Sequence, residues 1–104
     1  MAEYEVHNNE TDMQFEVLLS EKKAYLSYRF YKKDIALMHT FVPAEFEGKG
    51  IASTLAKAAF NYAQTHNKQV IVFCPFVASF IQKHTEYKAQ LDPEHGRAAG
   101  NEAS

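Results

Sequence analysis

The chain has 104 residues, a length that suits one hydrophobic core and excludes two. Hydrophobic residues make up 46% of it, and its net charge of −2 argues against general binding to nucleic acid or anionic membranes, because both need a basic field. A single cysteine, the lack of an apolar run of about 18 residues, and an acidic N-terminus unlike a signal peptide predict a cytoplasmic protein.

The first half of the chain predicts antiparallel strands. After a polar start with a short strand near residues 4–6, residues 13–19 and 24–31 alternate apolar and polar side chains, as strands with one buried face do. Residues 35–42 return as a further strand, which ends at Pro43 because proline cannot donate to a strand ladder. We expect the three longer strands to form an antiparallel meander.

In the second half of the chain, the spacing of apolar residues changes from the alternation of a strand to the period of a helix. From Ile51 the apolar residues follow a helical spacing, which predicts a helix over about 49–66. Residues 69–74 are a continuous apolar run, typical of a buried strand. Pro75 then suits the first turn of a second helix. The order of elements predicts an α/β (α+β) fold with a mixed sheet, in which the first helix is a right-handed crossover.

The end of the chain differs in composition from the rest. Residues 92–104 are small or polar and have no apolar period, so they cannot offset the entropy lost on ordering. We predict one domain over residues 1–91 followed by a disordered tail.

A loop with two glycines, EFEGKGIAS, precedes the first predicted helix. Gly48 and Gly50 can adopt positive φ, so that successive backbone N–H groups converge at the helix N-terminus, where the helix dipole adds positive potential. This arrangement suits a phosphate or pyrophosphate, which Lys49, Ser53 and Thr54 could assist. The spacing matches neither a Walker A loop nor a Rossmann fingerprint. The alternative interpretation is an ordinary turn.

The segment V-P-x-x-x-x-G-x-G-I-A-x-x-L, residues 42–55, resembles the acetyl-CoA-binding segment of the GNAT acetyltransferase superfamily. The residue before the first glycine is Glu47, and no glutamine or arginine precedes the glycines as in the superfamily pattern Q/R-x-x-G-x-G/A. Downstream, the HTFVP strand end of residues 39–43 and the later Cys74 are similar to a short single-domain GNAT-type subfamily, with spacing intact over about residues 13–88. The resemblance implies a GNAT-like mixed sheet and an N-acetyltransferase, an acyltransferase that uses acetyl-CoA as co-substrate.

The resemblance also implies where coenzyme A binds. Pantetheine would pair with the strand before the loop, at Thr40, Phe41 and Val42. The pyrophosphate would lie on the loop and the helix start, at Glu47, Gly48, Lys49, Gly50, Ile51, Ala52 and Ser53. Many GNAT enzymes carry a tyrosine on the last helix as general acid, but this chain has Phe80 and Gln82 there, and the next tyrosine is Tyr87.

Two residues are candidates for catalysis. The resemblance implies that Cys74 accepts the acetyl group covalently, whereas its place at the end of an apolar strand equally suits simple packing. His39 is the candidate general base, because histidine titrates near neutrality. Strand alternation puts it on the face of Ile35, Leu37 and Phe41, where a buried core histidine is the alternative. The other histidines show no metal-ligand spacing, so we predict no metal.

The acceptor is expected to be an amine. Residues 20–23 alone join the first two long strands, where larger GNAT enzymes have helices that shape the acceptor site. We therefore expect an open site and an exposed amine on a larger molecule, such as a protein, with neither nucleic acid nor membrane as partner and a monomer or weak dimer as the assembly. The alternatives are a non-catalytic acyl-CoA-binding module and a protein-interaction module of the same fold.

Overall fold

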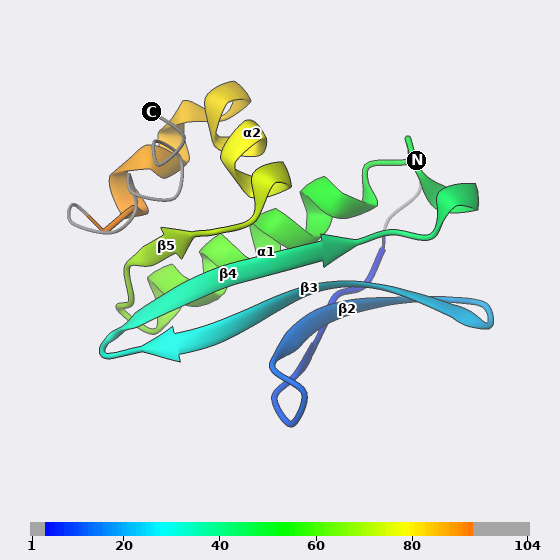
Figure 1. Cartoon of the computed structure of the whole chain (residues 1–104), viewed down its shortest axis with the longest axis horizontal. Coiled ribbons are helices and arrows are strands. Elements are labelled where there is room, and N and C mark those ends of the chain that lie inside the picture. The colour runs from blue at the N-terminus through cyan, green and yellow to red at the C-terminus, as the bar shows by residue number, and fades with distance from the viewer. Residues whose placement is uncertain (1–3, 93–104) are drawn as a thin grey trace.

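The computed structural model describes residues 4–92, which form a five-stranded mixed sheet with helices packed on it (Figure 1). The strands lie in chain order; neighbouring strands are antiparallel except β4 and β5, which are parallel. The elements are β1 (His7–Asn9), β2 (Gln14–Leu19), β3 (Lys22–Tyr31), β4 (Asp34–Phe41), the 3₁₀ helix η1 (Ala44–Phe46), α1 (Ile51–Thr65), β5 (Val70–Val72), α2 (Pro75–Lys83) and the 3₁₀ helix η2 (Thr85–Gln90). The predicted fold class is confirmed.

The first strand lies later in the chain than predicted. The sequence suggested a strand near residues 4–6, but β1 covers His7–Asn9 and pairs with the start of β2. The side chain of Asn9 accepts a hydrogen bond from the backbone N–H of Asp12 at 3.0 Å, and this local turn sets the register of the hairpin. The predicted position at residues 4–6 was therefore wrong, because the strand begins three residues later.

Both helices pack on the same face of the sheet and share one core. The apolar face of α1 is fully buried at Leu55 and Ala59, and its Phe60 ring stacks on Phe80 of α2 with centroids 6.3 Å apart. Figure 1 shows α1 running along β3 and β4, with α2 beside it next to β5. No helix within residues 4–92 is long and apolar enough to cross a membrane.

A β-bulge in β4 changes which residues face the helices. Tyr28 of β3 lies opposite Leu37, whereas the preceding Ser27 lies opposite His39, so Met38 is an extra residue in β4. Before the bulge, Leu37 faces the core. After it, Thr40 faces the helix side, while His39 is exposed on the other face.

The predicted face of His39 was therefore wrong. It shares a face with Phe41, as expected, but not with Ile35 and Leu37, which are buried in the core. Its ring lies beside that of Tyr25 on β3, with centroids 6.1 Å apart. The alternation rule fails here because a bulge inserts one residue and inverts the pattern that follows.

The chain remains attached to the sheet just beyond the predicted domain boundary. Leu91 forms a parallel bridge with Val70, and the N–H of Asp92 donates to the Val70 carbonyl at 2.9 Å. Before it, η2 places Tyr87 against Phe60, with ring centroids 4.9 Å apart. Residues 93–104 of the predicted tail lie outside the described residues.

Candidate functional site

A cavity of about 400 Å³ lies between the end of β4, the glycine loop and the first turn of α2. Its walls include most of the residues expected to bind coenzyme A, namely Thr40, Val42, Glu47, Gly48, Gly50, Ile51, Ala52 and Ser53. Phe41 and Lys49 are not among its lining residues. Phe46 and Phe76 line it as well, and the sequence did not identify them because isolated aromatic residues are common core residues.

The glycine loop has the backbone conformation that its sequence predicted. Gly48 has φ +83° and Gly50 has φ +80°, a region that favours glycine. A Cβ atom added at either position would meet no heavy atom within 4 Å, so the backbone angle and not crowding requires glycine. The space in front of the loop is therefore open to a ligand.

The start of α1 presents backbone donors to this cavity. Gly50 is the N-cap and provides no side-chain cap, and the first helical hydrogen bond runs from the Thr54 N–H to the Gly50 carbonyl at 3.0 Å. The N–H groups of residues 51–53 precede that bond and have no partner within the helix. The Thr54 hydroxyl also donates to the Gly50 carbonyl, at 2.9 Å, so it braces the loop. These donors and the helix dipole suit an anion.

Strands β4 and β5 separate beside the cavity. Their ladder ends with the pair Leu37 and Val72, followed by a hydrogen bond of 2.9 Å from the Phe73 N–H to the Leu37 carbonyl. Beyond it β4 continues to Phe41, whereas the chain after β5 turns into α2 (Figure 1). The edge of β4 after Met38 is thus not paired with β5, and an extended ligand could pair with its backbone.

Cys74 lies where the two strands separate. It is the N-cap residue of α2, its side chain is buried, and its sulfur lies 3.1 Å from the Thr40 hydroxyl oxygen. Thr40 belongs to the cavity wall, so the contact connects the candidate nucleophile to the candidate cofactor site. This contact could not be predicted from the sequence, because the two residues are 34 positions apart and only the bulge turns Thr40 inward.

The other candidate residues lie elsewhere. His39 is exposed on the opposite face of the sheet and is not among the residues that line the cavity. Tyr87 packs against Phe60 and Phe80, and it does not line the cavity either. The structure therefore brings Thr40 and Cys74 together but not His39 and Cys74.

Two ion pairs lie outside the cavity. Lys22 at the start of β3 contacts Glu45 of η1, with 2.7 Å between the Nζ and carboxylate oxygen atoms, and this hydrogen bond holds the pKa of Glu45 below its ordinary value. It ties the segment that precedes the glycine loop to the sheet. Both side chains are half exposed, so the pair contributes little to stability.

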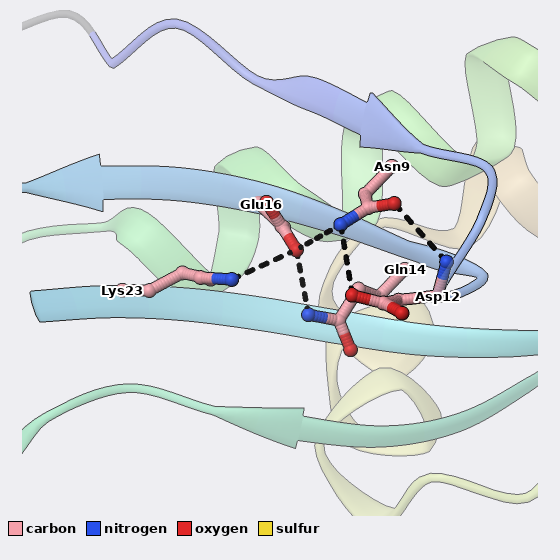
Figure 2. Close-up of polar contacts among 5 residues, drawn as sticks. All are labelled: Asn9, Asp12, Gln14, Glu16 and Lys23. Carbon is pink, nitrogen blue, oxygen red and sulfur yellow. Dashed lines mark hydrogen bonds and ion pairs between the residues drawn. The ribbon is translucent and has the colours of Figure 1, made fainter.

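The second ion pair belongs to a cluster around the buried Glu16 of β2 (Figure 2). One carboxylate oxygen accepts hydrogen bonds from Gln14 at 2.7 Å, Asn9 at 3.0 Å and Lys23 at 3.2 Å. Burial alone would raise the pKa of Glu16, but the bonds from these three donors outweigh it and hold the pKa below 4.5. The cluster joins β1, β2 and β3.

The chain is similar to known proteins in sequence and in fold. Residues 14–91 match the family model described as GCN5-related N-acetyl-transferase. Protein NATD1 of Xenopus tropicalis is 31% identical over 93 residues, which cover 85% of this chain and 85% of that protein. Protein NATD1 of Homo sapiens is 30% identical over 93 residues, covering 85% and 82%.

A solved structure is similar as well. The solution structure of a GCN5-like protein from Staphylococcus aureus superposes with a TM-score of 0.69 and 26% sequence identity, over 88% of this chain and 91% of that one. The family match over residues 14–91 covers the glycine loop, the strands that flank it and both helices. The chain belongs to the GCN5-related N-acetyltransferase family.

Proposed function

We propose that this protein binds acetyl-CoA and transfers its acetyl group to an amine. The observation that supports this most directly is the cavity, because open backbone donors at the start of α1 lie next to the unpaired edge of β4. A pyrophosphate fits the first feature, since helix N-termini attract anions. A pantetheine arm fits the second, since it is extended and carries amide groups that can pair with a strand.

The proposed contacts follow the resemblance. The pyrophosphate lies on the backbone of residues 47–53, with the Lys49 ammonium near enough in sequence to approach it from solvent. The pantetheine arm pairs with residues 40–42 and leads the thioester toward the place where β4 and β5 separate. By spacing, the glutamine or arginine of the pattern falls on Glu45 and not on Glu47. Glu47 contributes through its backbone, so the missing glutamine or arginine does not remove a required donor.

Acetyl transfer can take one of two routes. In the first, the Cys74 thiolate attacks the acetyl carbonyl carbon and forms a new C–S bond, while the bond to the coenzyme sulfur breaks and that thiolate takes up the proton given up by Cys74. A neutral amine then attacks the acetyl-cysteine and expels the Cys74 thiolate, which takes up the proton that the amine loses. In the second, the amine attacks the acetyl carbonyl carbon of acetyl-CoA directly, and the bond to the coenzyme sulfur breaks so that the coenzyme leaves as a thiolate. The amine's proton passes to a base, for which His39 is the candidate.

The acceptor is proposed to be an amine displayed by a larger molecule. Around Tyr25, His39 and Phe41 the face of the sheet opposite the cavity is open, and Phe41 itself is 45% exposed. A small acceptor would gain little burial on such a surface, whereas a protein could cover it. The further proposals from the sequence are unchanged: a cytoplasmic protein, a monomer or weak dimer, no metal, and a folded domain that ends near residue 91.

The second candidate function is acyl-CoA binding without catalysis. It is favoured by the residues on α2, where Phe80 and Gln82 stand in place of the general-acid tyrosine that many GNAT enzymes carry. Tyr87 does not substitute for it, because its ring packs on Phe60 and Phe80.

Three measurements test the proposal. Isothermal titration with acetyl-CoA distinguishes both acyl-CoA functions from a module whose glycine loop is only a turn, since the turn predicts no binding. Intact mass after incubation with acetyl-CoA then detects an acetyl adduct, and transfer to a lysine-rich test protein detects turnover. Binding without adduct or transfer supports the second candidate, and absence of binding contradicts both.

A further inference from the structure

Cys74 and Thr40 connect two cavities of the molecule. Thr40 lines the cofactor cavity, and Cys74 lines a second cavity of about 320 Å³ together with Phe73 and Ser79. The Thr40 hydroxyl and the Cys74 sulfur, 3.1 Å apart, are the contact between the two walls. The sulfur is thus close to the cofactor site, while its residue, which is buried, also lines the second cavity.

We infer that Thr40 is a positioning residue, whose hydroxyl holds the Cys74 sulfur beside the cofactor cavity and stabilises it as a thiolate. The inference rests on the proposed function and adds a residue to it. A thiol can donate its proton to the Thr40 oxygen, and after deprotonation the Thr40 hydroxyl can donate to the sulfur. The same pair of atoms can therefore stay in contact in both protonation states, and the sulfur does not need to move before it reacts.

The bulge at Met38 is what makes this contact available. Without the extra residue, the alternation of β4 would turn His39 toward the helix face and Thr40 away from it. With it, the Thr40 hydroxyl faces the sulfur and the His39 imidazole does not. Thr40 therefore has the place that alternation assigned to His39, but it stabilises the thiolate by donating a hydrogen bond and does not act as a base.

The step that Thr40 assists is the attack of Cys74 on the acetyl group. The sulfur forms a bond to the acetyl carbon, the bond from that carbon to the coenzyme sulfur breaks, and the electron pair leaves with the coenzyme, which receives the proton lost by Cys74. A donor held at the sulfur favours the thiolate before attack and favours its departure when the amine later displaces it.

The test compares Thr40→Val, which removes the hydroxyl at nearly constant size, with Thr40→Ser, which keeps it. The readout is the rate of Cys74 alkylation by iodoacetamide at pH 7.5 without acetyl-CoA. A hydrogen bond to a charged sulfur changes the thiolate fraction by about tenfold or more. A less stabilised thiolate is also intrinsically more reactive. On a logarithmic scale, this offsets about half of the loss in rate that the lower thiolate fraction causes. We expect alkylation of Thr40→Val to slow by about three- to tenfold, and Thr40→Ser to stay within about twofold of the unmodified protein.

Thr65→Val is the matched control, because Thr65 is an exposed residue at the end of α1. It should leave the alkylation rate unchanged. If Thr40→Val is unfolded by circular dichroism, Thr40→Ala replaces it with the same expected result. The inference is overturned if a folded variant without the hydroxyl reacts as fast as the unmodified protein, or if Thr40→Ser reacts as slowly as Thr40→Val.

Titration with acetyl-CoA keeps the two proposals apart. If the unmodified protein does not bind acetyl-CoA, the proposed function fails, while alkylation still decides whether Thr40 stabilises the sulfur. If it binds and forms the acetyl adduct, Thr40→Val should form that adduct more slowly by about the same factor as it is alkylated. An unchanged rate of adduct formation would overturn the role of Thr40 in the transfer.

Discussion

The backbone N–H of Asp92 donates to the carbonyl of Val70 at 2.9 Å, so the end of the described chain is attached to the free edge of β5. Leu91 forms a bridge with the same residue and packs against the core. The two residues lie at the boundary that composition alone placed at residue 91. They continue the sheet, because an exposed strand edge offers unpaired donors and acceptors.

Truncation can locate the end of the domain. A chain that ends after Asp92 should keep its melting temperature and its affinity for acetyl-CoA. A chain that ends after Gln90 loses the Val70 contacts and should be less stable by about 1 to 2 kcal/mol. For a domain of this size that corresponds to a fall in melting temperature of about 4 to 8 °C per kcal/mol. A large fall on truncation after Asp92 would show that the domain extends further.

Replacement of Gly50 tests the proposed position of the pyrophosphate. Gly50→Val should abolish acetyl-CoA binding, because a β-branched residue resists positive φ and its side chain would enter the space in front of the helix N-terminus. Gly50→Asn is the matched control for backbone strain, since asparagine tolerates positive φ but still carries a Cβ atom. Calorimetry should find both variants impaired. Wild-type affinity in a folded Gly50→Val protein would refute the placement.

Much of the fold follows from patterns that a sequence displays directly. Alternation in residues 24–31 and helical spacing after Ile51 reflect burial on one face, and the glycines mark positive φ. No sequence pattern indicates the bulge at Met38, since no glycine or proline accompanies it and the flanking residues are compatible with a regular strand. The contact of Thr40 with Cys74 depends on that bulge and on parallel pairing of distant strands, so the sequence could propose each residue for the site but not their relationship.

Cys74 distinguishes the two routes of acetyl transfer. If the acetyl group passes through its sulfur, Cys74→Ala should lose the adduct and turnover yet keep its affinity for acetyl-CoA. If the residue only packs, the same change should cost about 1 kcal/mol of stability from a small cavity and leave turnover per folded molecule intact. Cys74→Ser separates size from chemistry, because serine is a poor nucleophile without a strong base. An active serine variant would argue against the covalent route.

The direct route predicts that replacement of His39 changes how turnover depends on pH. If its imidazole takes the amine's proton, His39→Ala should flatten the dependence of turnover on pH near neutrality while leaving acetyl-CoA affinity unchanged. His66→Ala, which removes an exposed imidazole at the end of α1, is the matched control and should keep the wild-type profile. Identical pH profiles for the two alanine variants would exclude His39 as the base. Because His39 lies away from Cys74, it can act as the base only for an amine that approaches from the face of the sheet opposite the cavity.

The Glu16 cluster predicts how stability depends on pH. Because the bonds to Glu16 hold its folded pKa below 4.5, the carboxylate's contribution to stability is fully present above about pH 4.5 and is lost as pH falls through the lower folded pKa. Glu16→Gln removes the charge that Lys23 pairs with and should cost about 1 to 2 kcal/mol at pH 7. As pH falls toward the folded pKa of Glu16, the difference between variant and wild type should shrink, because a growing share of the wild-type carboxyl is protonated.

Thermal unfolding of both proteins at pH 7 and pH 3 measures this difference. Glu21→Gln, at an exposed turn residue, is the control for a general loss of negative charge and should change the melting temperature little at either pH. The wild type should lose more stability on acidification than Glu16→Gln does, since only the wild type can protonate a buried carboxylate at position 16. Equal losses in the two proteins would mean that the hydrogen bonds to Glu16 stabilise its neutral form as well as the ionised one, and that the cluster joins the first three strands without making their stability depend on pH.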